Sequence, residues 1–225
     1  MLITRHIANS SDHQEMDLRP TKILGIGVNY HAHATEMGKQ PPDEPLVFLK
    51  PPSAMMADGG AIVRPRGYER VDYEGELAVV MGRRGRRIAV EDALDYVLGY
   101  TCLLDITVRD LQKRDGQWAR AKGFDTFCPL GPRIVAGLDP SDLHLTTRVN
   151  GTVRQDSSTS DLIFSVPMII SFISKAMTLE PGDVITTGTP SGVGNLEIDD
   201  EVEVEIQGIG TLHAHVMDDV EPEGR

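Results

Sequence analysis

Short β-rich segments, separated by glycine, proline and asparagine turns, divide the C-terminal part of the chain. After Gly131 these segments are RIVAG, LTTRVNG, DVITTGTP, DEVEVEIQGIG and TLHAHVMD. Asn150-Gly151 is a hairpin signal, because both residues tolerate the positive φ of a two-residue turn. One segment, VPMIISFISKAM, interrupts the strands as a helix. The pattern predicts a β-rich domain with a few helices and shows no internal repeat or linker.

The N-terminal half mixes strands, helices and loops. Residues 22–28 (KILGIGV) form an apolar run that predicts a strand, and NYHAHATEMGKQ after it predicts a loop or short helix. Prolines flank LVFL, which we interpret as a short strand between loops. Farther along, VDYEGELAVVMG predicts a strand, VEDALDYVLGY a helix, TCLLDIT a strand and VRDLQKR a second helix.

With 225 residues, the chain is long enough for one well-packed domain and short for two. The first twenty residues are polar, so we expect residues 1–20 to form a loose N-terminal arm before a single domain over residues 21–225. They lack the apolar segment of a signal peptide, and no run approaches membrane-spanning length. A cytoplasmic location is therefore expected.

Acidic residues outnumber basic ones 34 to 22, which gives a net charge of −12. Such a field repels nucleic-acid phosphates and anionic membrane surfaces, so neither is expected as a partner. Solubility is the simplest explanation of the charge, and an anionic metabolite would need local cations. The two cysteines, Cys102 and Cys128, are not in CxxC spacing and belong to no Cys/His cluster. We expect them to be reduced core thiols.

Two acidic residues stand two apart in the predicted strand DYEGELAVV. Glu74 and Glu76 would then point to the same face of a sheet, where their carboxylates repel each other unless a cation lies between them. Taken alone, the pair is better explained as a solvated strand edge. The apolar run after Glu76 places both acids at the margin of a core, and so favours a cation site.

A third acid, Asp105, ends the apolar run TCLL and precedes a predicted helix. It could simply cap that helix. Arg109 and Gln112 follow four and seven residues later, which predicts that all three share one helical face. An arginine can grip a substrate carboxylate, and three carboxylates without cysteine suit Mg²⁺, or Mn²⁺ as the alternative. Lys122, in RAKGFDTFCPLGP, would add a positive charge.

The chain resembles the fumarylacetoacetate hydrolase family, in particular its short acylpyruvase-like members. The resemblance runs through GVNYHAHATEMG, FLKPP, DYEGELAVV, DITVRDLQ, AKGFDTFCPLGP, NGTVRQ, DLIFSVP and TTGTPSGVG, in that order. It implies an α+β, mostly β fold, a mixed β-sandwich roll with a few peripheral helices, assembled as a homodimer or a higher homo-oligomer. One departure is Leu103-Leu104, where many relatives have Ala-Asn.

The resemblance also implies roles for individual residues. Mg²⁺ would be bound by Glu74, Glu76 and Asp105. Substrate would be contacted by Arg109, Gln112, Gly188 and Thr189. Catalysis would involve His33, Glu36 and Lys122. Without the resemblance, the histidines of this region would be taken for surface residues, and TTGTPSGVG for a turn.

Three functions remain open at this point. The first is hydrolysis of a C–C bond in an acylpyruvate such as fumarylpyruvate or acetylpyruvate, with His33 activating a water and the cation and Lys122 stabilising the enolate that forms. The second is decarboxylation of oxaloacetate or isomerisation of an unsaturated 2-oxo diacid. The third, favoured least, is a non-enzymatic metabolite-binding protein. The two enzymatic functions expect a small anionic 2-oxo acid as the substrate.

Overall fold

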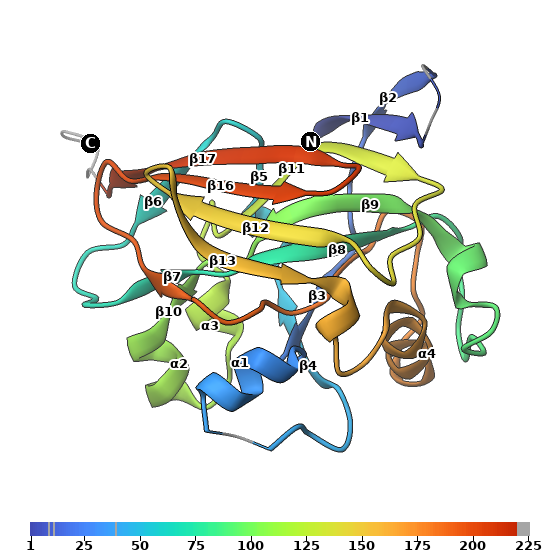
Figure 1. Cartoon of the computed structure of the whole chain (residues 1–225), viewed down its shortest axis with the longest axis horizontal. Helices are drawn as coiled ribbons and strands as arrows, with labels where there is room; N and C mark the ends of the chain where they lie inside the picture. The colour runs from blue at the N-terminus through green and yellow to red at the C-terminus, as the bar shows by residue number, and fades with distance from the viewer. Residues whose placement is uncertain (9, 11, 39, 220–225) are drawn as a thin grey trace.

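The computed structural model of the chain describes residues 1–8, 10, 12–38 and 40–219. Within these residues, the strands form three sheets, and the helices gather on one side of them (Figure 1). The helices are α1 (His31–Glu36), α2 (Arg109–Asp115), α3 (Ala119–Lys122) and α4 (Val166–Ala176). Single 3-10 turns cover Pro52–Ala54, Ala93–Tyr96 and Thr159–Asp161. Strands thus dominate, as the sequence predicts.

The largest sheet has nine strands in the order β2-β1-β11-β9-β8-β14-β3-β4, with β5 also paired to β11. Its strands are β1 (Leu2–Ile7), β2 (His13–Asp17), β3 (Ile23–Gly27), β4 (Leu46–Lys50), β5 (Met55–Ala57), β8 (Gly75–Met81), β9 (Val97–Leu104), β11 (Cys128–Ala136) and β14 (Val184–Thr186). Both parallel and antiparallel pairs occur, so the sheet is mixed.

The other two sheets are smaller. The five-stranded sheet, in the order β13-β12-β16-β17-β6, contains β6 (Ala61–Arg64), β12 (His144–Val149), β13 (Thr152–Ser158), β16 (Glu201–Ile206) and β17 (Gly210–Asp218). The three-stranded sheet, β10-β7-β15, contains β7 (Val71–Tyr73), β10 (Thr107–Val108) and β15 (Gly194–Asn195). The hairpin predicted at Asn150-Gly151 joins β12 to β13, and both residues have positive φ, 51° and 72°.

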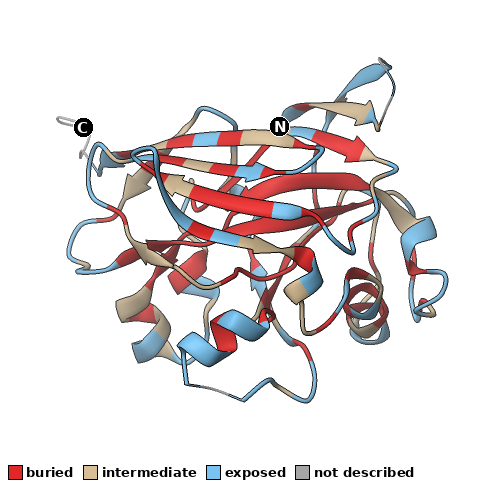
Figure 2. Ribbon diagram, viewed as in Figure 1, coloured by how far each residue is buried: buried red, intermediate tan, exposed pale blue. Residues whose placement is uncertain are grey.

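Strand β8 is buried along its whole length (Figure 2) and lies between two hydrophobic clusters. Leu77 and Val79 belong to the larger cluster, which includes side chains of the five-stranded sheet, whereas Ala78 and Val80 belong to the cluster on the opposite face. This alternation follows from the two-residue period of a strand. A strand that is covered on both faces gives any polar side chain on it a buried environment.

Two regions differ from the sequence prediction. Residues 1–20, expected to be a loose arm, contain β1 and β2, which form an antiparallel hairpin, and β1 also pairs with β11. The helix expected over VEDALDYVLGY is limited to the 3-10 turn at Ala93–Tyr96, because Val97 already begins β9 and pairs with Met81 on β8. Long-range strand pairing overrides local helix spacing in this segment.

Both cysteines, Cys102 and Cys128, are free and buried, which confirms the prediction of reduced core thiols. In the described part of the chain, no helix combines the length and the apolar character needed to cross a bilayer.

Candidate active site

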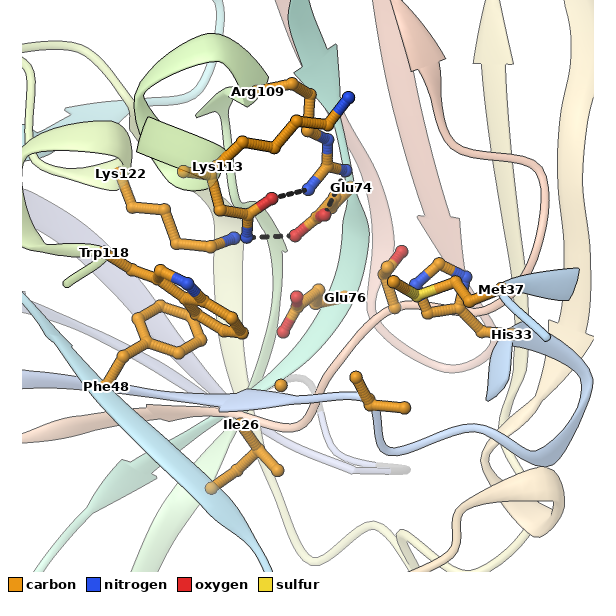
Figure 3. A pocket seen from close by; sticks show the side chains of 14 residues that line it. Ile26, His33, Met37, Phe48, Glu74, Glu76, Arg109, Lys113, Trp118 and Lys122 are labelled. Atoms are coloured by element: carbon orange, nitrogen blue, oxygen red, sulfur yellow. Dashed lines mark hydrogen bonds and ion pairs between the residues drawn. The ribbon is translucent and has the colours of Figure 1, made fainter. Parts of the chain in front are cut away.

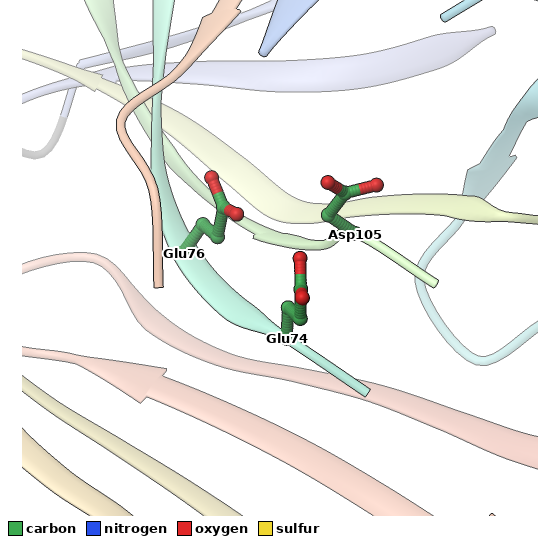
Figure 4. Close-up of side chains that lie close together, drawn as sticks. All are labelled: Glu74, Glu76 and Asp105. Carbon is green, nitrogen blue, oxygen red and sulfur yellow. The ribbon is translucent and has the colours of Figure 1, made fainter. Parts of the chain in front are cut away.

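The register between β8 and β9 brings three acidic side chains to one face of the large sheet. Glu76 is paired with Leu103, and the backbone N–H of Asp105 donates to the Glu74 carbonyl at 2.9 Å, which continues the pairing. Directly opposed residues of neighbouring strands share a face, as do residues two apart on one strand. One carboxylate oxygen of each acid lies within 4.8 Å of the others, and all three acids are buried (Figure 4).

This pairing corrects the helical-face argument for Asp105. The residue lies before β10, and α2 begins only at Arg109, so Asp105 neither caps α2 nor shares a face of it. Arg109 and Gln112 do lie one turn apart on α2, and Nη1 of the arginine donates to Oε1 of the amide at 2.9 Å. Arg109 also donates to Glu74 and, at 2.8 Å, to Asp72. The register of β8 and β9 therefore brings the three acids together, and α2 contacts one of them, Glu74, through Arg109.

Two buried lysines neutralise part of the acidic charge. Nζ of Lys122 donates to Glu74 and to the Thr107 hydroxyl, both at 2.8 Å, and to Asp105, which uses all three of its protons. Nζ of Lys50 donates to Asp105 at 2.5 Å and to the Phe127 carbonyl at 2.9 Å. Burial works against the charge on Lys122, but the carboxylates of Asp105 and Glu74 outweigh it and raise the lysine's pKa.

Glu76 is the acid of this cluster with the weakest cationic support. Burial, together with the nearby Asp105 and Glu74 carboxylates, raises the pKa of Glu76 to about 8. Glu74 is also buried, yet the positive charges of Arg109 and Lys122 hold its pKa well below the usual range. A divalent cation would remove the repulsion that protonates Glu76, and three hard oxygen donors suit such an ion. The residues present therefore fit a divalent metal.

A glycine brings the β14 loop close to Glu76. The backbone N–H of Gly188 donates to Oε2 of Glu76 at 2.8 Å, and the φ of Gly188 is 91°. A Cβ at this position would lie 2.9 Å from the Cβ of Asn29 and 3.1 Å from the Ile26 carbonyl oxygen. Only glycine fits both the conformation and the space.

The neighbouring residue of this loop, Thr189, is anchored to the strand that carries the glutamates. Its hydroxyl donates to the Gly75 carbonyl at 2.9 Å and accepts from Nε2 of Gln155 at 2.8 Å. Oε1 of Gln155 in turn accepts from the Gly75 N–H at 2.9 Å. The Thr189 proton is thus engaged within the protein, and the hydroxyl positions the loop.

A histidine and a glutamate approach the acids from α1. Nδ1 of His33 lies 3.1 Å from Oε2 of Glu36, and the same carboxylate accepts from the backbone N–H of Gly192 at 3.2 Å. His33 is buried, whereas Glu36 is largely exposed. The turn from β3 into α1 passes through Val28, whose φ of 55° is uncommon for a β-branched residue. Asn29 then ties this turn to the Thr187 carbonyl at 2.8 Å.

A cavity of about 320 Å³ joins these groups, which is the size of a small-metabolite site. Figure 3 shows Glu74 and Glu76 near its centre, His33 on one side, and the Phe48 and Trp118 rings on another. The two rings pack with centroids 5.4 Å apart, and Nζ of Lys122 lies 4.8 Å from the Phe48 ring centroid. The cavity thus has a charged end and an aromatic wall.

The structure brings the residues expected from the sequence into one region. Seven of them line the cavity: His33, Glu74, Glu76, Arg109, Gln112, Lys122 and Thr189. The other three each bond to one of these seven: Asp105 to Lys122, Glu36 to His33 and Gly188 to Glu76. Their separate roles in catalysis, binding and metal coordination remain predictions.

Sequence reasoning assigned no role to Lys50, Gln155 or Trp118. Lys50 lies in FLKPP and Gln155 in NGTVRQ, but a lysine that ends an apolar strand and a glutamine in a hairpin look like surface residues. The useful signal at Lys50 is its position directly after four apolar residues, LVFL, because a buried lysine needs a carboxylate partner.

The sequence model of a family described as "Fumarylacetoacetate (FAA) hydrolase C-terminal" matches residues 22–217, which is most of the chain. The chain belongs to the fumarylacetoacetate hydrolase family. Among curated proteins, it is 48% identical to the oxaloacetate tautomerase YisK of Bacillus subtilis over 86% of this chain and 69% of that protein.

Solved structures of the same fold include two named enzymes. A 5-carboxymethyl-2-hydroxymuconate delta-isomerase from Mycobacterium smegmatis has a TM-score of 0.86 and 44% identity, covering 94% of this chain and 87% of its own. A fumarylpyruvate hydrolase from Pseudomonas aeruginosa, solved with Mn²⁺ and pyruvate, has a TM-score of 0.86 and 33% identity, covering 97% of both chains. The predicted family, its mixed, mostly β fold and an enzymatic role are thereby confirmed.

Proposed function

We propose that this enzyme hydrolyses a C–C bond in an acylpyruvate, such as fumarylpyruvate or acetylpyruvate, using Mg²⁺. One observation carries the proposal: His33, which is paired with Glu36, lines the same cavity as Glu74 and Glu76 of the three-carboxylate cluster. Glu74, Glu76 and Asp105 would hold the ion, with Mn²⁺ as the alternative. Once bound, the ion would receive the 2-oxo acid end of the substrate and stabilise negative charge there.

The protein's own groups supply the proton transfers. A His33 Nδ1–H that donates to Glu36 leaves Nε2 free to take a proton from water. The resulting hydroxide attacks the distal carbonyl, the C–C bond breaks, and its electron pair stays on the pyruvate fragment as an enolate. Protonation of that enolate by His33 gives pyruvate and a carboxylic acid.

The substrate would be bound by N–H groups of Arg109 and Gln112 that donate to no other described residue. Arg109 has five N–H donors, of which its bonds to Asp72, Glu74 and Gln112 use three. The Gln112 amide group accepts from Arg109 through Oε1, which turns its NH₂ group toward other partners. Lys122 supports the site through the positions of Glu74 and Asp105. Its three protons are engaged, so direct contact with substrate would require exchange of one bond.

A second candidate function is tautomerisation or decarboxylation of a 2-oxo diacid of the oxaloacetate or 2-hydroxyhepta-2,4-dienedioate type. It is favoured by the higher identity to the tautomerase, 48%, and to the isomerase, 44%, than to the hydrolase, 33%. Here His33 would move a proton on the carbon next to the 2-oxo group, without an attacking water.

A substrate panel separates the two functions. Acetylpyruvate, fumarylpyruvate, oxaloacetate and 2-hydroxyhepta-2,4-dienedioate are each supplied with Mg²⁺, and pyruvate release, CO₂ release and the ultraviolet absorbance of the enol are followed. Hydrolysis predicts stoichiometric pyruvate and a kcat/KM for an acylpyruvate at least about tenfold above that for oxaloacetate. Faster enol disappearance from oxaloacetate, without acylpyruvate cleavage, would select the second function. No turnover of any compound would reject both.

We also propose that the chain assembles as a homodimer or a higher homo-oligomer, in line with the family resemblance. Light scattering of the purified protein measures the mass, and a mass near 24.6 kDa would refute this.

A further inference from the structure

A second cavity of about 350 Å³ adjoins the active-site cavity. Five residues line both spaces: His33, Met37, Arg109, Gln112 and Lys113. The second cavity is completed by Glu36, Arg70, Asp72 and Val193. A substrate held at the carboxylate cluster can therefore extend past α2 into a chamber that the proposed chemistry does not use.

The cations of this region are paired with carboxylates, with one exception. Arg70 grips Asp72 at 2.8 and 2.9 Å, and Arg109 bonds to Asp72 and Glu74. Lys50 and Lys122, as described above, bond to the acids of the cluster. Lys113 is exposed, extends along the cavity wall (Figure 3), and makes no ion pair or hydrogen bond with any described residue.

The net charge of the side chains around these two cavities indicates the charge of the ligand that they would bind. Four carboxylates line the two cavities, those of Glu36, Asp72, Glu74 and Glu76, and so do four cations, Arg70, Arg109, Lys113 and Lys122. Asp105 and Lys50 line neither cavity, but Asp105 is ion-paired with Lys122 and with Lys50, which adds one charge of each sign. These ten charges cancel, so a bound divalent ion leaves two positive charges. A 2-oxo acid with one carboxylate would neutralise half of that excess, whereas one with two carboxylates would neutralise all of it.

We propose that Lys113 is a specificity-determining residue, which binds a distal carboxylate and makes the enzyme select dicarboxylic 2-oxo acids over monocarboxylic ones. The inference rests on the proposed function, because it assumes that the 2-oxo end of the substrate is held at the carboxylate cluster. It is compatible with either reaction, since fumarylpyruvate and oxaloacetate both carry a second carboxylate, and it disfavours acetylpyruvate as the preferred substrate.

Binding can be measured without turnover, because Trp118 lines the cavity and is the chain's single tryptophan. Quenching of its fluorescence in the Mg²⁺-loaded protein gives Kd for pyruvate, 2-oxoglutarate, 2-oxoadipate and the 5-methyl ester of 2-oxoglutarate. The ester keeps the open-chain 2-oxo acid end and removes the charge of the distal carboxylate. At least one diacid is expected to bind more tightly than pyruvate, and 2-oxoglutarate more tightly than its 5-methyl ester.

The deciding variant is Lys113→Met, which keeps the length of the side chain and removes its charge. It should weaken binding of the preferred diacid about fivefold at low ionic strength, and the effect should shrink with added salt. The Kd of pyruvate should change less than twofold, because pyruvate has no distal carboxylate that could pair with Lys113. Lys113→Arg should retain the preference for diacids. Lys175→Met, at an exposed position on α4, is the matched control and should change neither Kd.

Different outcomes reject different claims. If no 2-oxo acid binds in a metal-dependent manner, the proposed function fails. If diacids bind but Lys113→Met leaves their Kd unchanged, or weakens pyruvate equally, the role of Lys113 is refuted while the proposed function stands. Equal affinity of the wild type for 2-oxoglutarate and its 5-methyl ester would also refute it. Circular dichroism of each variant confirms that the exposed substitution leaves the fold intact.

Discussion

His33 and Glu36 lie one turn apart on α1, with Nδ1 of the histidine 3.1 Å from Oε2 of the glutamate. The pair would be a marginal surface contact on a six-residue helix, but His33 is 7% exposed and lines the cavity that holds Glu74 and Glu76. Glu36 also accepts from the Gly192 N–H at 3.2 Å, so the carboxylate is held from two sides. Glu36 can therefore orient the imidazole toward the cavity.

Replacement of His33 by alanine should lower kcat by about 100-fold or more, because a positioned general base contributes on that scale. Glu36→Gln should lower kcat less, by about tenfold, since the imidazole remains but loses its orienting anion. Steady-state kinetics on the best substrate measures both. Mg²⁺ affinity, measured by calorimetry, should be unchanged. His31→Ala, at an exposed position of the same helix, is the matched control, and an unaltered kcat in His33→Ala would disprove the assignment.

Removal of the metal should lower both activity and thermal stability. Chelation with EDTA should abolish turnover, and added Mg²⁺ or Mn²⁺ should restore it. At a metal concentration of about 100 times Kd, binding stabilises the folded state by about 2.7 kcal/mol, or about 5–10 °C in Tm for a chain of this size. Differential scanning calorimetry measures the shift. The same shift in Glu76→Ala would show that the ion binds elsewhere.

The pKa of Glu76, raised to about 8, makes the stability of the metal-free protein depend on pH. In the unfolded chain this carboxyl titrates near 4.5, so between these values the folded state holds a proton that the unfolded state lacks. The contribution of Glu76 to the free energy of unfolding therefore falls as pH rises through this window, by at most about 1.4 kcal/mol per pH unit.

Urea unfolding in EDTA, at about pH 5 and about pH 8, tests this dependence. Glu76→Gln cannot lose a proton, so its stability relative to the wild type should increase between the two conditions. Parallel pH profiles for the two proteins would show that Glu76 is already ionised in the fold at low pH. Saturating Mg²⁺ should reduce the difference, because the ion favours the carboxylate form.

The buried ion pair of Lys50 and Asp105 should be important for stability. Lys50→Met removes a cation that lies 2.5 Å from Asp105, and breaking a buried pair from one side typically costs about 3–5 kcal/mol. Lys122 still contacts Asp105, so the lower end of that range is expected. Denaturant unfolding at fixed Mg²⁺ measures the loss. Lys175→Met should cost less than about 0.5 kcal/mol, as an exposed substitution does, and an equal cost at both lysines would contradict the structure.

Gly188 lies in the loop that contacts Glu76, and Gly182, which lies outside that loop, is its matched control. Both have positive φ, 91° and 85°, so alanine is strained at either position. A Cβ would approach Asn29 to 2.9 Å at Gly188, but its nearest neighbour at Gly182 is 3.6 Å away. Gly182→Ala should lose about 1–2 kcal/mol of stability through backbone strain, and Gly188→Ala should lose more, because its Cβ also crowds Asn29. Gly188→Ala alone should weaken metal binding, because its N–H positions Glu76. Equal metal affinity in both variants would remove that role.

Several parts of the fold could be predicted because their signals are local. The hairpin at Asn150-Gly151, the helix at α4 and the strand through Glu76 follow from residue types within a few positions of one another. The strand assigned to Val97–Tyr100 could not be predicted in this way. Its spacing suits a helix, and only pairing with β8 and β11, which the local pattern does not contain, makes it extended.

In the candidate site too, some features follow from the local sequence and others depend on the tertiary structure. The spacing of Glu74 and Glu76, the acid at Asp105 and the ordered motifs of the family identify the carboxylate cluster from the sequence alone. The roles of Lys50 and Lys113 come only from the tertiary structure. Lys50 is 55 residues from Asp105, and its burial depends on the packing of β4 against the cluster. Lys113 differs from other surface lysines only because the cations around it are already paired with carboxylates.

By itself, the sequence determined which acids could gather, because strand alternation and motif order are properties of neighbouring residues. The tertiary structure decided how that acidic charge is balanced and which cation of the site has no partner among the described residues. Ion pairing depends on distance and burial in three dimensions, and residues far apart along the chain supply most of both.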